Sequence, residues 1–242
     1  MTKEIEIQRQ YYAQTAISYD EMHLDKDQEH VLALHLLAGY IEFYQIRSVL
    51  DVGAGTGRTL LWLKNRFPDL IIKGIEPVAA LREQGYEKGI SPENLIDGDA
   101  YQLPFKENSF DLVCEFAVLH HVREPEKMIR EMSRVASKMV CISDCNFIGQ
   151  GSLPLRLLKY AIFSLGLWSV ADQIKTKGKG YTISESDGLA YSYSVYQSFC
   201  TLQKFWKTLR TTSTKGASDG WFGSIISAEQ LLLIALNKNL PN

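Results

Sequence analysis

Hydrophobic residues follow two different spacings along this chain, and the spacing changes at regular intervals. Short apolar runs of strand length occur at 47–52, 70–75, 95–96, 110–116 and 139–143. Between these runs, apolar residues recur at the three- and four-residue spacing of helices. Such an alternation predicts a parallel sheet with right-handed crossovers. The run 110–116 is almost continuously apolar, which is typical of a central strand covered on both faces.

The pattern also predicts elements outside this alternating core. We expect a helix from a cap at Asp27 to about Phe43, with an apolar stripe formed by Val31, Leu34, Leu37, Ala38 and Ile41. Beyond Asn146 the regular alternation stops. For this part we expect an apolar helix over 153–170, a helix over 195–209, and a closing strand over 231–236 beside an antiparallel neighbour near 211–214.

The stretch Ser48–Leu60, SVLDVGAGTGRTL, joins the first strand to a helix through three alternate glycines. Glycines there permit a tight turn and a close approach of a ligand to the backbone. A dinucleotide fingerprint places its third glycine three residues after the second, but Arg58 stands at that position. Asp51 precedes the first glycine by two residues, where a carboxylate suits an ammonium group and would repel a pyrophosphate.

This D-x-G-x-G-x-G pattern resembles the first motif of the class I S-adenosylmethionine (SAM) methyltransferases. The resemblance implies that SAM is the cofactor and that the turn lies against its amino-acid part. It further implies that Glu76, after the second strand, accepts the ribose hydroxyls, and that Asp99 and the Ala100 N–H contact the adenine. The full set of cofactor-binding residues expected from the resemblance is Asp51, Gly53, Ala54, Gly55, Gly57, Glu76, Pro77, Asp99, Ala100, Glu115, Phe116 and Tyr19.

The resemblance also implies a fold and a division of the chain. The fold is α/β and Rossmann-like: a seven-stranded mixed sheet with helices on both faces, a reversed last strand and an inserted cap. Residues 1–44 are expected to form a lid and helix, with Tyr11, Tyr12 and Tyr19 as weaker cofactor contacts or plain aromatic anchors. The SAM-binding core spans 45–146, the substrate cap 147–194, and a helix with the closing strands 195–242.

The motif LHHV after the fourth strand, residues 119–122, again resembles the family, and the end of that strand faces the transferred methyl group. His121 and His120 are therefore candidate general bases, since histidine titrates in the range such a proton transfer needs. Asp144 after the fifth strand is the competing candidate. We expect no other histidine near this edge. We also expect no metal, because Glu115, Asp144 and Asn146 do not form the oxygen cluster that magnesium prefers.

The cap is where the acceptor would be selected. Lys175, Lys177 and Lys179 are candidates for holding a phosphate or carboxylate, although a solvated loop fits them equally. The tyrosines of the segment 181–196 would stack on a ring or sugar, or fill the core of the cap. This content favours a hydroxyl of a sugar or secondary-metabolite intermediate as the small-molecule acceptor. O- or C-methylation of a phenol or quinone is the alternative.

Composition limits the partners and the location. A net charge of −2 gives no reason to expect a nucleic-acid partner. The polar N-terminus lacks the apolar core of a signal peptide, and the most apolar run carries Arg156 and Lys159, so no stable membrane insertion is expected. We expect a cytoplasmic protein with reduced cysteines, and a homodimer is left open. The rival functions are a nicotinamide oxidoreductase, a non-catalytic SAM-binding protein and an aminopropyl transferase.

Overall fold

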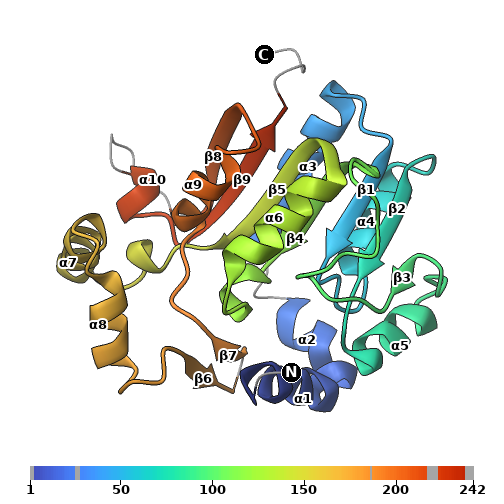
Figure 1. The fold of residues 1–242 in the computed structure, drawn as a ribbon. Helices are drawn as coiled ribbons and strands as arrows, with labels where there is room; N and C mark the ends of the chain where they lie inside the picture. The colour runs from blue at the N-terminus through green and yellow to red at the C-terminus, as the bar shows by residue number, and fades with distance from the viewer. Residues whose placement is uncertain (1–2, 25–27, 186, 217–222, 238–242) are drawn as a thin grey trace.

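A computed structural model of the chain describes residues 3–24, 28–185, 187–216 and 223–237. Within this part, seven strands form one mixed sheet in the order β3-β2-β1-β4-β5-β9-β8 (Figure 1). These strands are β1 (Ser48–Val52), β2 (Ile71–Ile75), β3 (Leu95–Ile96), β4 (Phe110–Phe116), β5 (Ala136–Cys145), β8 (Thr208–Lys215) and β9 (Gln230–Leu236). The first five are parallel, and β9 runs antiparallel to both β5 and β8. The predicted fold class, with its reversed last strand, is confirmed.

Helices cover both faces of the sheet because alternate residues of each strand point to opposite sides. On one face, Leu50 and Val52 pack with the apolar stripe of α6 (Pro125–Val135). On the other, Val49 packs with α3 (Gln28–Phe43) and α4 (Arg58–Arg66). A crossover helix, α5 (Ala79–Glu87), joins β2 to β3. The central strands are therefore buried on both sides, as their continuous apolar runs predict.

Three short helices precede the core: α1 (Lys3–Thr15), η1 (Ala16–Ser18) and α2 (Tyr19–Leu24). Helix α1 lies across the edge of the sheet where the parallel strands end, in contact with α5 and with β7 (Gly188–Ala190) (Figure 1). Asp20 fixes α2 to the core by accepting from Thr56 Oγ1 at 2.6 Å and by pairing with Lys88.

The segment between β5 and β8 lies mostly outside the sheet (Figure 1). It contains η3 (Phe147–Gly149), α7 (Leu153–Ser164), α8 (Trp168–Lys175), the β6–β7 hairpin with β6 (Thr182–Ser184), η4 (Val195–Ser198) and α9 (Phe199–Leu202). A short helix, α10 (Gly223–Ile226), precedes β9. No helix among the described residues is long and apolar enough to cross a membrane.

Several predicted elements differ from the structure. The expected helix 153–170 is two helices, because Gly166 with a φ of 71° ends the first. The expected helix 195–209 stops at Leu202, and Leu209 already belongs to β8. Val31 is 49 % exposed, and the buried stripe of α3 includes Ala33 instead. The proposed cap at Asp27 lies outside the described residues.

Candidate active site

Two cavities lie beneath α1 at the carboxyl edge of the parallel strands, where ligands bind in open α/β sheets. The first, of about 170 Å³, is lined by the glycine turn and the ends of β2, β3 and β4. The second, of about 530 Å³, lies between α3, the end of β5 and the segment that follows it. Both are lined by a shared set of residues: Tyr12, Tyr19, Phe116, Ala117, His121 and Tyr191. The two cavities therefore meet at this set, directly after β4.

The glycine turn forms one wall of the first cavity. Gly53 and Gly55 have φ angles of 80° and 55°, in the left-handed region that favours glycine. A Cβ on Gly53 would lie 2.5 Å from Val118 Cγ2, so no side chain fits without displacing that valine. The Gly53 N–H donates to the Ile75 carbonyl at 2.8 Å, which closes the turn against the end of β2.

Glu76 lies at the floor of this cavity and is 5 % exposed. Its Oε1 accepts from the Val78 N–H at 2.8 Å and its Oε2 from the Gly55 N–H at 3.0 Å. Burial raises the pKa of Glu76 to about 7, although these two hydrogen bonds oppose the shift. A buried carboxylate with further lone pairs directed into a cavity is suited to accept hydrogen bonds from a ligand's hydroxyl groups.

Asp51 is 2 % exposed and lies behind the turn rather than in the lining of either cavity. Burial raises its pKa to about 7, and the charge of Glu76 adds to the shift. Two acids that both titrate near neutrality thus lie next to the glycine turn. A ligand ammonium group bound at the turn would favour the ionised form of Asp51.

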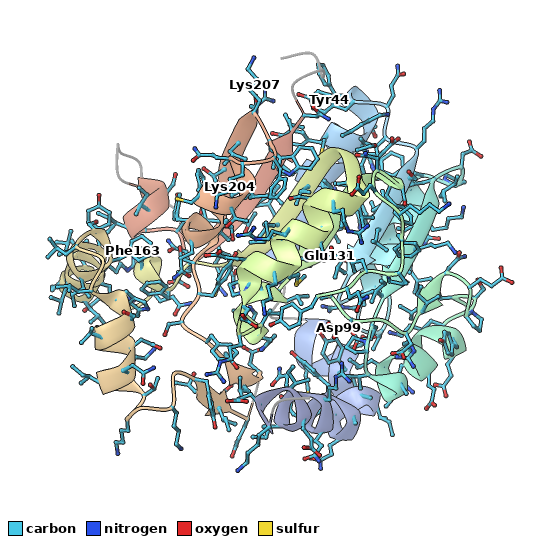
Figure 2. The ribbon with its side chains drawn as sticks, in the orientation of Figure 1. Tyr44, Asp99, Glu131, Phe163, Lys204 and Lys207 are labelled. Atoms are coloured by element: carbon cyan, nitrogen blue, oxygen red, sulfur yellow. The ribbon has the colours of Figure 1, made fainter. Side chains whose placement is uncertain are left out.

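The other predicted cofactor residues fall into two groups. Those that line the first cavity are Tyr19, Pro77, Asp99, Ala100 and Phe116; Asp99 lies on the loop after β3 (Figure 2). Those that line neither cavity are Ala54, Gly57 and Glu115. Gly57 is needed for packing, because a Cβ there would lie 2.1 Å from Ile90 Cδ1. The Glu115 carboxylate is fully buried and accepts from the Val118 N–H at 2.8 Å.

The predicted catalytic residues come together at the shared wall: His121 belongs to it, His120 lines the second cavity, and Asp144 is buried behind them. His120 Nδ1 lies 2.7 Å from Asp144 Oδ1, and the His120 N–H donates to Asp144 Oδ2 at 3.2 Å. The Nε2 atoms of His120 and His121 each lie 3.3 Å from a carboxylate oxygen of Asp187. His121 Nδ1 lies 2.6 Å from the Leu189 carbonyl oxygen. Gln8 Nε2 lies 3.0 Å from the same Nδ1. Because the closer carbonyl can only accept, we assign the proton of the neutral ring to Nδ1, which leaves Nε2 as the acceptor.

These contacts give the two histidines different charge states. Burial alone would lower the pKa of His120, but Asp144 and Asp187 raise it well above the usual value, so this ring is a cation at neutral pH. Burial lowers the pKa of His121, and the neighbouring His120 charge lowers it further, so this ring is neutral. Tyr12 Oη, 2.9 Å from His121 Nε2, donates to it. His121 is thus the neutral acceptor in the cluster, and His120 is already protonated.

Two acids in the cluster differ in the same way. Burial alone would raise the pKa of Asp144, but the charge and hydrogen bond of His120 keep it lowered, so Asp144 is ionised. Burial raises the pKa of Glu115 well above its usual value, and the Asp144 charge raises it further. Glu115 is therefore neutral, and Asp144 is committed to its ion pair with His120.

Several residues of the cluster were not predicted from the sequence. Asp187 lies in the β6–β7 hairpin, 66 positions after His121, and the dipeptide Asp187-Gly188 signals only a turn. Gln8 of α1 accepts from the Leu189 N–H at 2.5 Å and so ties α1 to the same hairpin. Contrary to the expectation of no further histidine at this edge, His30 lines the second cavity, with Nδ1 3.2 Å from Ser143 Oγ.

The far end of the second cavity is polar. It is lined by Gln150, Lys175, Thr182, Ser184 and Ser192. Lys175 Nζ donates to Ser192 Oγ at 3.2 Å. Of the three predicted lysines, only Lys175 belongs to the lining; Lys177 and Lys179 are exposed. Tyr191 and Tyr193 of the tyrosine-rich segment also line this cavity.

The His120, His121 and Asp187 ligand atoms lie close enough together to hold a metal ion, as do those of His120, Asp144 and Cys145. With the charge states assigned above, His120, Asp144 and Asp187 form an ion-pair network that needs no metal to hold it together. A protonated His120 Nε2 donates to Asp187 and has no lone pair for a metal. The expectation that no metal is required therefore stays a prediction, and chelation tests it.

The fold and the glycine turn together define a Rossmann-like protein with a cavity at the carboxyl edge of its sheet, the place where ligands bind in open α/β sheets. Residues 50–139 match the model of a family described as a methyltransferase domain. Residues 50–139 thus form a methyltransferase domain, which supports, for this part of the chain, the class I SAM-dependent methyltransferase family that the sequence motifs resemble.

Relatives of known name show the same domain with different acceptors. Norajmaline N-methyltransferase of Rauvolfia serpentina is 36 % identical over 151 residues, which cover 60 % of this chain and 46 % of that protein. Phosphatidylethanolamine N-methyltransferase of Cereibacter sphaeroides is 33 % identical over 47 % of this chain and 57 % of its own length. Demethylmenaquinone methyltransferase of Staphylococcus aureus is 33 % identical over 54 % and 55 %. The chain thus spans about half the length of the curated relatives it matches.

Solved structures share the fold over nearly the whole chain. A SAM-dependent methyltransferase of Thermotoga maritima, described as a possible histamine N-methyltransferase, superposes with a TM-score of 0.61 at 18 % identity and covers 95 % of this chain and 99 % of that one. The YcgJ protein of Bacillus subtilis gives a TM-score of 0.55 at 18 % identity, with coverages of 87 % and 100 %. At these identities the likeness concerns the fold alone.

Proposed function

We propose that this protein binds SAM in the first cavity and transfers its methyl group to a small molecule held in the second. The observation that carries the proposal is that the two cavities meet at one shared wall after β4, which includes Phe116, Ala117 and His121. Methyl transfer requires the nucleophile to approach the sulfonium in line. A junction between a cofactor cavity and an acceptor cavity supplies that approach.

The residues of the first cavity fit SAM. Gly53 and Gly55 bring bare backbone to the lining, against which its amino-acid part would lie, and Glu76 offers a buried carboxylate to its ribose hydroxyls. Asp99 lies across the cavity, where the adenine is expected. When bound, SAM supplies a methyl group on a positively charged sulfur, a strong electrophile that needs no further activation by the protein.

The work of the chain's own residues is then to orient the acceptor, exclude water and remove a proton. We assign the proton transfer to His121, whose Nε2 is unprotonated and reaches the shared wall. The acceptor hydroxyl would take the place of the Tyr12 hydrogen bond at Nε2. Once protonated, Nε2 can donate to Asp187 Oδ1, 3.3 Å away, which stabilises the cation that forms. His120 and Asp144 position this pair.

For the acceptor, the polar end of the second cavity supports a hydroxyl of a sugar or secondary-metabolite intermediate. Hydroxyl and amide side chains there can bond to several hydroxyl groups at once. An amine is the second candidate, supported by the relatives named as N-methyltransferases and by Asp187 and Glu29 in the cavity lining. A phenol or quinone acceptor has its support in the demethylmenaquinone relative.

The test of the proposed function begins with the cofactor. Titration calorimetry of the purified protein with SAM and, separately, with NAD should give a one-to-one complex with SAM only. Formation of S-adenosylhomocysteine is then measured with panels of hydroxylated, amine and quinone acceptors. Binding of NAD in preference to SAM would reject the proposal. SAM binding without turnover on any panel would favour the non-catalytic alternative.

A further inference from the structure

Helix α7 has its polar and apolar faces reversed relative to an ordinary surface helix: its cations face the protein and its leucines face outward. Arg156 donates to the Gly151 carbonyl at 2.6 Å and lies 3.7 Å from Glu229. Lys159 donates to the Gln150 carbonyl at 2.7 Å. The opposite face has Leu153, Leu157 and Leu158 at helical spacing, each 49 % to 60 % exposed.

Helix α8 continues this surface. Its Val170 and Ile174 are 58 % and 75 % exposed, and Leu165 between the helices is 72 % exposed. Neither helix, both being fully described, contains a buried residue. They are held to the body by aromatic contacts. Trp168 stacks on Phe147 at 4.1 Å, and Phe163, labelled in Figure 2, meets the same Phe147 ring edge-on at 6.0 Å.

The two helices stand at the outer side of the molecule, away from the sheet (Figure 1). We call their outward surface the apolar face and define it by Leu153, Leu157, Leu158, Leu165, Val170 and Ile174. Soluble proteins rarely gather this many exposed large apolar side chains on two contacting helices unless something binds them. The positions are ordered by two packed helices, so the exposure is built into the fold.

The charges next to the apolar face indicate what kind of partner it fits. Residues 151–184 contain five basic side chains and one acidic, although the whole chain has a net charge of −2. Arg156 and Lys159 face the protein and Lys175 lines the second cavity. Lys177 and Lys179, which follow α8 directly and are both exposed, are therefore the cations next to the apolar face. Leucines flanked by lysines are suited to the boundary between acyl chains and headgroups of an anionic membrane. A second copy of the chain would bring the same positive charges together, which disfavours self-association through this face.

We propose that the apolar face docks the protein on the surface of an anionic lipid bilayer. The helices would lie in the plane of the interface, with the leucines among the acyl chains and the lysines near the headgroup phosphates. Lys175, the last residue of α8, lines the second cavity, so the docked surface adjoins that cavity. If the proposed methyltransferase function holds, the acceptor reaches the site from the membrane surface; the docking itself does not depend on that function.

The experiment is co-sedimentation of the full chain with vesicles of phosphatidylcholine alone and of phosphatidylcholine mixed with phosphatidylglycerol. We expect binding to the mixed vesicles and little to the neutral ones. The double variant Leu158→Glu/Leu165→Glu should abolish binding, and Lys177→Glu/Lys179→Glu should weaken it about tenfold or more. Because all four side chains are exposed, these variants should keep the melting temperature and the SAM affinity of the wild type.

Matched controls use equally exposed residues elsewhere. Phe43→Glu, at a position 65 % exposed, and Lys204→Glu/Lys207→Glu, on the α9–β8 side (Figure 2), should leave vesicle binding unchanged. Absence of binding to mixed vesicles would overturn the proposal. So would equal binding by wild type and the Leu158→Glu/Leu165→Glu variant, or a dimer in sedimentation velocity that this variant dissociates while vesicles stay unbound. Methyl transfer that persists in any of these cases would separate a failed docking proposal from a failed function.

Discussion

The imidazole rings of His120 and His121 lie 3.9 Å apart, centroid to centroid, and their surroundings shift their pKa values in opposite directions. His120 pairs with Asp144 on one side and Asp187 on the other. His121 shares the Asp187 contact but has no second carboxylate; its other neighbours include the Leu189 carbonyl and the Tyr12 hydroxyl. Two adjacent residues of the same type thus have different charge states, and on the proposed function only the neutral one, His121, can receive a proton.

Replacing His121 by Asn should reduce the rate of methyl transfer by about a hundredfold to ten-thousandfold, because a general base is lost. SAM affinity should change little. Single-turnover rates across pH test this assignment. His121 is active as a base when it is neutral, and its pKa lies below the ordinary value. In the wild type the pH–rate profile should therefore have an ascending limb whose midpoint lies below about pH 6.5. A His121→Asn variant with the wild-type rate and pH profile would show that the site works by positioning alone or through Asp144.

Replacing Asp187 by Asn should shift the ascending limb of the pH–rate profile to lower pH. The Asp187 charge raises the pKa of His121, so its removal lowers the pKa further. His120→Asn is the opposing control, because the His120 charge lowers the pKa of His121 and its loss should move the limb to higher pH. Shifts in the same direction in both variants, or none, would contradict the network described here.

Replacing Glu76 by Ala should weaken SAM binding about tenfold to a hundredfold. The variant loses a charge-assisted hydrogen bond to the ribose, which contributes about 1.5–3 kcal/mol. Calorimetry measures the dissociation constant. Glu131→Ala, which alters an acid on α6 that bonds to Arg134 (Figure 2), is a control that should leave it unchanged. An unaltered constant in a folded Glu76→Ala variant would remove Glu76 from the site.

SAM binding should weaken as pH falls through about 7. Burial raises the pKa values of Asp51 and Glu76 to about 7, so both acids bind protons below that pH in the free protein. The ionised forms are the ones that pair with an ammonium group and accept from hydroxyls, so binding at lower pH releases protons. Calorimetry in buffers of different ionisation enthalpy counts the released protons. The Glu76→Gln variant should release fewer protons on binding SAM. A SAM affinity of the wild type that does not change with pH would refute the expectation.

Chelation by EDTA should leave the methyl-transfer rate unchanged. A protonated His120 Nε2 donates to Asp187 and offers no lone pair, and attack on a sulfonium methyl needs no Lewis acid. The measurement is turnover after dialysis against EDTA, followed by addition of magnesium or zinc. A loss of rate that either ion restores would assign the His120, His121 and Asp187 cluster to a metal.

The sheet was predictable because its strands form short, strongly apolar runs separated by glycine and proline, and β4 matched its predicted bounds. The C-terminal helix was not. The stretch 195–209 contains apolar residues at helical spacing, but Trp206 is buried with its Nε1 donating to Ser133 Oγ at 3.0 Å. The chain then enters β8, where β-branched threonines favour an extended conformation. Tertiary packing therefore decided where the helical pattern of 195–209 gives way to the extended conformation of β8.

The site divides in a similar way. Glu76 and Asp99 follow strands, and their place after the strand predicts their place at the cavity. Asp187 gives no such signal, because it reaches His121 only when the β6–β7 hairpin folds back over the core. Glu115 differs, although it lies at the end of β4 as expected. Its side chain is buried in the interior near Asp144 and lines neither cavity. Sequence position predicts the edge of a sheet better than the direction of a side chain.

Helix α1 lines both cavities and is tied to the β6–β7 hairpin through Gln8. One helix therefore covers both cavities. If the proposed function holds, a single displacement of α1 would open both, so spent cofactor and methylated product would leave in the same event. The rate of that opening would then depend on how tightly Gln8 and Tyr11 hold the hairpin, through the Leu189 N–H and the Glu185 carbonyl.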